Sequence, residues 1–185
     1  RQNIEVTDYF SANRKALLVL MKGIDSLGFV ITDPESVCKE NFDILLKNIH
    51  IGSIEINFHC NRKAGEILDI LMNIISERGL DTEKIHGAIE ADPIGRLMLN
   101  GTLCVTVEAG FDYLASLTAK ASELVNLRTI HLNASYFSNA GSDIVQELAY
   151  GLSAGSEYIS QLIGRGVSAD VAASSKCIGI GVPSA

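Results

Sequence analysis

Two carboxylates lie where a predicted strand ends, near the middle of the chain. Glu90 closes the run 85–90, which is predicted to be a strand, and Asp92 stands directly before Pro93. In parallel α/β folds the carboxyl ends of the strands face the ligand crevice, so Glu90 is a candidate for acid–base or ligand-binding chemistry. The alternative is that Glu90 is a solvated rim charge and that Asp92 only caps the helix begun by Pro93.

A second polar stretch, residues 133–141, also follows a predicted strand. A loop in this place lines the active site of many β/α enzymes, so Asn133 and Asn139 are candidate rim residues that could contact substrate. Ser138, Asn139 or Ser142 could instead be caps of the helix that follows.

Two glycine motifs suggest chemistry but lack the context that the chemistry needs. The Gly-x-Ser-x-Gly match at 151–155 lies inside a helical pattern over 142–162. A hydrolase nucleophile needs a strand before it, so small residues that allow close packing explain this motif better. The Gly-x-Gly at 179–181 is followed by Ser184 rather than a third glycine, which makes a dinucleotide loop a weak hypothesis.

The histidines and cysteines do not form a metal-binding pattern. His59 and His131 fall in predicted strands, where a hydrogen-bonded core residue is commoner than a catalytic base. Cys38, His59 and Cys60 could bind a metal only if His59 and Cys60 faced the same way, and adjacent strand residues do not. The four cysteines are widely spaced, which favours free buried thiols over disulfides.

The composition of the 185-residue chain excludes several classes of protein. Its net charge of −7 argues against a nucleic-acid binder. The longest apolar run is the six residues 16–21, so we expect no membrane span, and the polar start resembles no secretory signal. We therefore expect no nucleic-acid partner, no membrane and a cytoplasmic location. The start without Met and the end just after an apolar run suggest a segment excised from a longer protein.

Short β-rich runs alternate with longer helical patterns along the chain. This order predicts parallel strands joined by right-handed crossovers. The fold class is therefore α/β, either a doubly wound sheet or, preferred slightly, a partial segment of a (β/α)8 TIM barrel that forms a single domain over 1–185. Strands are predicted at 29–32, 53–59, 85–90, 129–135 and 177–182, and helices at 11–27, from 33, at 63–78, from 92 to near 101, around 111–124 and at 142–162.

Two details of this prediction bear on the core. Gly28 is expected to end the first helix, as glycine often does. The last long helix is marked by six apolar residues, which are Ile144, Val145, Leu148, Leu152, Ile159 and Leu162.

Two stretches resemble the barrel domain of methylmalonyl-CoA mutase. They are Thr-Ile-His-Leu-Asn-Ala-Ser-Tyr-Phe-Ser-Asn-Ala-Gly-Ser-Asp-Ile-Val-Gln-Glu-Leu-Ala-Tyr at 129–150 and Gly-Ala-Ile-Glu-Ala-Asp-Pro-Ile-Gly at 87–95. The most specific parts are Ala140-Gly141 and the Gln-Glu-Leu-Ala at 146–149. The resemblance spans most of 12–182 and is strongest to the small subunit of the bacterial heterodimeric enzymes.

The resemblance implies a cofactor and a partner. The family interconverts methylmalonyl-CoA and succinyl-CoA through adenosylcobalamin radicals, as part of propionate metabolism. Its acyl-CoA threads the barrel, and a separate domain with an Asp-x-His-x-x-Gly motif binds the cobalamin. That motif is absent from this chain. We therefore expect the adenosylcobalamin to be bound by the other subunit, a large catalytic subunit, in a heterodimer.

Three departures from the family pattern point to a chain without its own chemistry. Tyr136 stands where catalytic subunits carry a histidine, Glu90 replaces a substrate-binding glutamine, and Asp112 replaces an arginine that binds the substrate carboxylate. Reversing that charge removes the anion's partner. We expect a structural, non-catalytic subunit without catalytic, cofactor-binding or metal residues. The alternatives are an independent β/α-barrel enzyme that uses Glu90, Tyr136 and Asn139, with a cationic substrate suiting Glu90 and Asp112, or a binding module without chemistry.

Overall fold

A computed structural model describes residues 1–60, 63–103 and 105–179. The chain divides into two compact units, one made of residues 1–90 with 123–127 and the other of 91–122 with the residues from 128 onward. Each unit is described by itself below. The expectation of a single domain over 1–185 stays a prediction.

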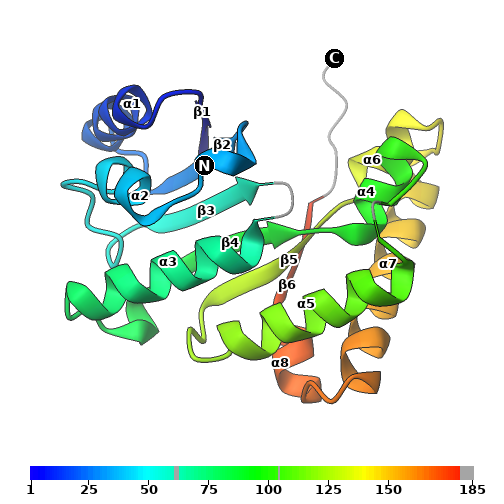
Figure 1. The fold of residues 1–185 in the computed structure, drawn as a ribbon. Helices are drawn as coiled ribbons and strands as arrows, with labels where there is room; N and C mark the ends of the chain where they lie inside the picture. Colours follow the sequence, from blue (N-terminus) through cyan, green and yellow to red (C-terminus); the bar gives the residue numbers. More distant parts are fainter. Residues whose placement is uncertain (61–62, 104, 180–185) are drawn as a thin grey trace. The chain divides into compact units, whose positions relative to one another are not determined.

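The first unit is a parallel sheet with its helices in alternation (Figure 1). Its strands pair in sequence order from β1 to β4. Helix α1 packs against β1, and α3 packs against β3. The elements are β1 (Gln2–Val6), α1 (Tyr9–Met21), β2 (Ser26–Ile31), a 3-10 helix (Pro34–Ser36), α2 (Lys39–Leu45), β3 (Glu55–Cys60), α3 (Ala64–Glu77), a second 3-10 helix (Thr82–Lys84) and β4 (His86–Ala91).

One face of this sheet is apolar. The strand register aligns Ile4, Phe29, Phe58 and Ile89 in one row across the four strands. Each of these side chains is at most 1% exposed. The Phe29 and Phe58 rings lie 5.8 Å apart, and Phe42 of α2 lies 5.3 Å from Phe58. This row and α2 therefore form the core of the unit.

The other face of the sheet is polar, because side chains alternate between faces along a strand. The row beside the apolar one aligns Glu5, Val30, His59 and Glu90. A buried parallel sheet is usually apolar on both faces. Polar side chains in these places therefore need partners on the sheet itself.

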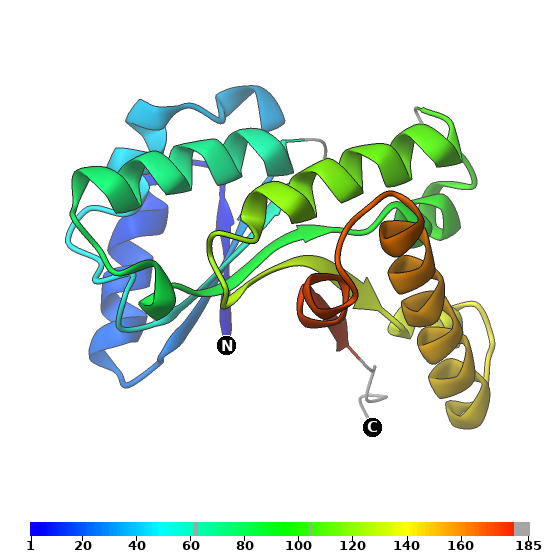
Figure 2. The ribbon, with the colours of Figure 1, turned by 90° about the horizontal axis from the view of Figure 1, so that it is seen from below.

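The second unit is mostly helical and also contains two paired strands. Strands β5 and β6 are parallel, and α7 packs against α5, α6, α8 and β6 (Figure 2). Phe111 and Leu114 of α5 are buried, as are Tyr158 and Leu162 of α7. The elements are α4 (Pro93–Asn100), α5 (Val107–Ala121), β5 (Leu127–Asn133), α6 (Ser135–Asn139), α7 (Ile144–Gly164), α8 (Ala169–Ser174) and β6 (Lys176–Gly179).

The predicted α/β class is confirmed, with parallel strands, alternating helices and an order consistent with a segment of a β/α barrel. Strand β1 was not predicted, because five residues with only two buried side chains give a weak pattern. Gly28 does not end a helix. Helix α1 stops at Met21, Gly23 takes the positive φ of 87°, and Gly28 lies inside β2.

The predicted strand over 129–135 was too long at its carboxyl end. Asn133 Oδ1 accepts hydrogen bonds from the Ser135 backbone N–H at 3.1 Å and the Ser135 hydroxyl at 2.6 Å. This local ring turns the chain out of the strand and into the short helix α6. The last predicted strand, 177–182, and the Gly-x-Gly motif extend into residues 180–185, outside the described residues.

Four of the six apolar residues that marked the last long helix are exposed, whereas Leu162 is buried. Ile144, Val145, Leu148 and Leu152 are 72%, 71%, 46% and 56% exposed. The buried face of α7 consists instead of Glu147, Gly151, Gly155, Tyr158 and Leu162. Because Gly151 and Gly155 lie buried inside a helix with no strand before them, the Gly-x-Ser-x-Gly motif is not a nucleophile turn.

Candidate functional site

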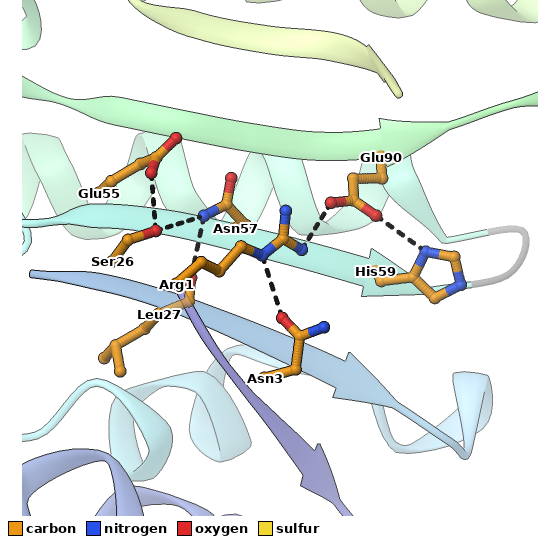
Figure 3. Close-up of polar contacts among 8 residues, drawn as sticks. All are labelled: Arg1, Asn3, Ser26, Leu27, Glu55, Asn57, His59 and Glu90. Carbon is orange, nitrogen blue, oxygen red and sulfur yellow. Dashed lines mark hydrogen bonds and ion pairs between the residues drawn. The ribbon is translucent and has the colours of Figure 1, made fainter. Parts of the chain in front are cut away.

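Glu90 is the centre of an ion-pair network on the polar face of the first unit (Figure 3). It stands near the end of β4, and its side chain is only 8% exposed. Arg1 Nη2 donates to Glu90 Oε1 at 2.6 Å, and His59 Nδ1 lies 3.1 Å from Glu90 Oε2. Each carboxylate oxygen of Glu90 therefore lies within hydrogen-bond distance of a nitrogen atom from another strand or from the start of the chain.

The Arg1 side chain crosses the sheet to reach Glu90, and Gly28 makes room for it. Arg1 Nε donates to Asn3 Oδ1 at 3.0 Å. A Cβ placed on Gly28 would lie 2.2 Å from Asn3 Oδ1 and 2.8 Å from Arg1 Nε. A larger residue at position 28 would therefore displace both side chains.

A second polar group lies on the same face, toward the amino ends of the strands (Figure 3). The Ser26 hydroxyl donates to Glu55 Oε2 at 2.6 Å. Asn57 Nδ2 donates to the Leu27 carbonyl at 3.0 Å and to Ser26 Oγ at 3.4 Å. Asn57 is 2% exposed, so its amide is satisfied by the strand beside it rather than by solvent.

Asp92, in the second unit, has a different role from Glu90. Its Oδ1 accepts from the Gly95 backbone N–H at 2.8 Å and from the Tyr158 hydroxyl at 2.5 Å. Tyr158 also accepts from the Ile94 backbone N–H at 2.9 Å. These bonds satisfy the start of α4, so the interpretation of Asp92 as a helix cap is confirmed.

Burial dominates the electrostatics of this cap. Desolvation raises the pKa of Asp92, although the hydrogen bonds from Tyr158 and Gly95 and the charge of His131 oppose the change. Burial and the neighbouring Asp92 carboxylate raise the pKa of Tyr158 far above its usual range. The tyrosine therefore stays a neutral hydrogen-bond donor.

Asp112 lies on the exposed side of α5 and is paired with Arg165. Arg165 Nε donates to Asp112 Oδ1 at 2.6 Å, and the Arg165 guanidinium lies 5.5 Å from the centre of the Phe111 ring. The Asp112 side chain is 68% exposed. The pair links α5 to the end of α7 at the surface.

The other predicted positions in the second unit lie at the end of β5 and in α6. Tyr136 lies in α6. A Cβ atom added to Gly95 would lie 2.9 Å from Cε2 of the Tyr136 ring. Asn133 ends β5 through its bonds to Ser135, while Asn139 is exposed at the end of α6. Neither asparagine caps α7.

The cap of α7 is Asp143, which the sequence analysis passed over in favour of Ser142. Asp143 Oδ1 accepts from the Gln146 backbone N–H at 2.8 Å, and Gln146 Oε1 accepts from the Asp143 backbone N–H at 3.1 Å. The spacing of an acidic residue three positions before glutamine could have revealed this capping box.

The partners of Glu90 were missed as well. Glu55, Asn57 and His59 recur at every second position, which indicates a polar sheet face. Nothing local indicates that Arg1 reaches Glu90, because 89 positions separate the two residues.

Within residues 1–60, 63–103 and 105–179, no three His, Cys, Asp or Glu residues are grouped closely enough to hold a metal ion. Cys38 is a free thiol, and burial raises the pKa of the Cys60 thiol. None of the described helices is both long and apolar enough to cross a membrane.

Comparison with known proteins assigns the chain to a family. The model of a family described as methylmalonyl-CoA mutase matches residues 35–176. The chain belongs to the methylmalonyl-CoA mutase family. This confirms the resemblance inferred from residues 87–95 and 129–150.

Two of the mutase relatives are small subunits. The methylmalonyl-CoA mutase small subunit of Porphyromonas gingivalis is 33% identical over 168 residues, which is 90% of this chain and 26% of the relative. The small subunit of Propionibacterium freudenreichii subsp. shermanii is 28% identical, over 84% of this chain and 24% of the relative. The mutase of Cereibacter sphaeroides is 28% identical over 135 residues, which is 71% of this chain and 19% of the relative. The chain thus spans about a quarter of the length of the small subunits it matches.

Proposed function

We propose that this chain is part of a non-catalytic small subunit of an adenosylcobalamin-dependent methylmalonyl-CoA mutase. The complex would be an isomerase that interconverts methylmalonyl-CoA and succinyl-CoA, working in the cytoplasm in propionate metabolism. Relatives named small subunits support a large-subunit partner, which would carry the chemistry.

The Glu90 network is the observation that carries this proposal. The family resemblance places a substrate-binding glutamine at this position, and here a carboxylate is tied to Arg1 and His59. A carboxylate at this place repels an anionic acyl-CoA. The former substrate position is thus used to hold the sheet face together.

Asp112 and Tyr136 support the same conclusion. Asp112, where the resemblance places an arginine, is paired with Arg165 on the helix surface. Tyr136 stands where the resemblance places a histidine, the residue type whose ordinary pKa lies closest to neutral pH. The residues at these positions therefore serve the fold.

We propose that adenosylcobalamin is held by the large subunit rather than by this chain. His59 is held by Glu90, and the sequence lacks the Asp-x-His-x-x-Gly motif that the resemblance associates with the cofactor. The cofactor would supply radicals for the rearrangement when it is bound to the large subunit. We assign it to that subunit and derive no step on this chain.

The test is turnover of the full-length complex with variants confined to this subunit. Tyr136→Phe and Glu90→Gln should leave kcat within about twofold of the unmodified complex, with Lys39→Ala as the surface control. The small subunit alone should show no turnover. A tenfold loss of kcat in an intact complex carrying Tyr136→Phe would contradict the proposal, because the phenol would then act in the reaction.

A further inference from the structure

We propose that the polar face of the first unit is a guanidinium-binding site that the chain fills with its own Arg1. Without the Arg1 side chain, the site would take a small guanidinium compound. This goes beyond the proposed function, because the ligand is a cation and binds without the partner subunit or an acyl-CoA.

The site supplies two acceptors to one guanidinium. Glu90 Oε1 accepts from Arg1 Nη2 at 2.6 Å, and Asn3 Oδ1 accepts from Arg1 Nε at 3.0 Å. One acceptor is charged and the other is a neutral amide, and they come from the two outer strands, β4 and β1, of the first unit. Two directed bonds from one planar cation match a guanidinium better than an ammonium.

The burial of the carboxylate makes this pairing stronger than a surface ion pair. The Glu90 side chain is 8% exposed and that of Arg1 is 30% exposed. By comparison, Lys39 is 37% exposed and its partners Asp43 and Glu77 are 47% and 56% exposed. Partly buried charges are screened less by salt and attract each other more strongly.

Gly28 shapes the floor of the site. The register places Gly28 between Asn3 on one side and Asn57 on the other. The 2.2 Å and 2.8 Å distances from its absent Cβ to Asn3 Oδ1 and Arg1 Nε show that the guanidinium lies where any side chain would be. Gly28 is therefore a positioning residue, since its lack of a side chain admits the cation.

The charges on the face select a cation over an anion. Glu55 and Glu90 both present carboxylates to it. An anion that replaced the Arg1 guanidinium would meet the Glu90 carboxylate directly, whereas a free guanidinium would restore the ion pair. Arg1 thus blocks a site whose chemistry suits a guanidinium compound.

The test is chemical rescue of Arg1→Ala in the full-length protein, with n-propylguanidinium as the probe. We expect a saturable rise in thermal unfolding temperature at millimolar probe, together with a change in the His59 imidazole nitrogen shifts, since His59 shares the Glu90 carboxylate. The wild-type protein should show neither response. Arg1→Ser serves as a second variant and should respond in the same way.

Three further variants separate binding at this site from general stabilisation. Arg1→Ala combined with Glu90→Gln removes the charge, and Arg1→Ala combined with Gly28→Val fills the floor, so both should lose the saturable response. Lys39→Ala removes an exposed cation and should show none. The proposal is wrong if neither Arg1 variant responds, or if the Glu90→Gln combination responds equally. Neither result depends on mutase turnover, so this inference and the proposed function can fail separately.

Discussion

Glu90 and Asp92 are separated by a single residue, yet their carboxylates belong to opposite environments. Glu90 is held by the guanidinium of Arg1 and the imidazole of His59 on a polar sheet face. Asp92 is held by a tyrosine hydroxyl and a backbone N–H among buried groups. The first carboxylate is paired with the Arg1 cation, while burial raises the pKa of the second.

The contrast shows that position at the end of a strand does not by itself assign chemistry. Both residues stand where a β/α enzyme would place catalytic carboxylates. One of them became an internal counter-ion and the other a helix cap. Their partners decide the role of each carboxylate. The Gly95 N–H that Asp92 caps is local, whereas Arg1 and His59 reach Glu90 from distant parts of the sequence.

Removing the Tyr158 hydroxyl should lower the free energy of unfolding more than any of the changes that follow. Tyr158→Phe leaves a half-buried Asp92 oxygen without this donor and the Ile94 N–H without its acceptor. We expect the free energy of unfolding to fall by about 2–3 kcal/mol, measured by urea denaturation. Tyr150→Phe, in the same helix but 45% exposed, is the control and should change it by under about 0.5 kcal/mol. Equal effects would mean that the buried cap adds nothing.

Neutralising Glu90 should have a smaller effect that depends on salt. Glu90→Gln keeps one amide oxygen as an acceptor but removes the charge that holds Arg1, so we expect a loss of about 1.5 kcal/mol at low ionic strength. The loss should shrink when unfolding is measured in 1 M NaCl, where the Debye length is about 3 Å. A loss that is unchanged by salt would mean that packing, not charge, is what Glu90 contributes.

Asp143 tests the same capping chemistry as Asp92 at an exposed site. Asp143→Ala removes the acceptor for the first N–H groups of α7, and we expect a loss of about 1 kcal/mol by thermal or urea unfolding. Ser142→Ala is the control, because its side chain does not cap the helix, and it should be nearly neutral. A larger loss from Ser142→Ala would restore the cap that the sequence first suggested.

The pH dependence of stability should have opposite signs at Asp92 and Asp8. Burial raises the folded-state pKa of Asp92 above 3.8, so the stability it contributes is present below pH 3.8 and is lost as the pH rises through the folded pKa. Hydrogen bonds from Ser11 lower the pKa of Asp8, so its contribution is present above pH 3.8 and is lost as the pH falls through the folded pKa.

Unfolding measured from pH 2 to 7 for Asp92→Asn and Asp8→Asn checks these signs. Relative to wild type, Asp92→Asn should gain stability as the pH rises above 3.8, because the amide carries no charge to bury. Asp8→Asn should lose stability over its own window as the pH rises. Parallel curves for the two variants would show that the two carboxylates do not differ in this way.

Local signals in the sequence predicted the elements well where they were strong. Helix α3 was predicted at 63–78 and spans Ala64–Glu77, since its apolar residues follow a helical period. Both ends of α4 were marked in the sequence, by Asp92 and Pro93 at the start and by Gly101 at the end. Gly101 takes the left-handed φ of 68°. Family motifs at 87–95 and 129–150 identified the mutase family, which the family model confirms.

The spacing of apolar residues did not predict the buried face of a helix that carries apolar residues on more than one side. In α7 the apolar residues Ile144 and Leu148 suggested one buried face, but burial follows the neighbouring face that carries Gly151 and Tyr158. The spacing of apolar residues predicts that a helix has an apolar face. Which face is buried depends on the elements that pack against the helix.

Short-range patterns along the chain were enough to predict the alternation of strands and helices, the caps of the clearest helices and the membership of the family. These depend on residues a few positions apart or on motifs read directly. Folding was needed to bring Arg1 and His59 to Glu90 and the Tyr158 hydroxyl to Asp92. The physical reason is that the charge and burial of a carboxylate depend on groups brought close by folding, at separations of 31 to 89 positions along the chain.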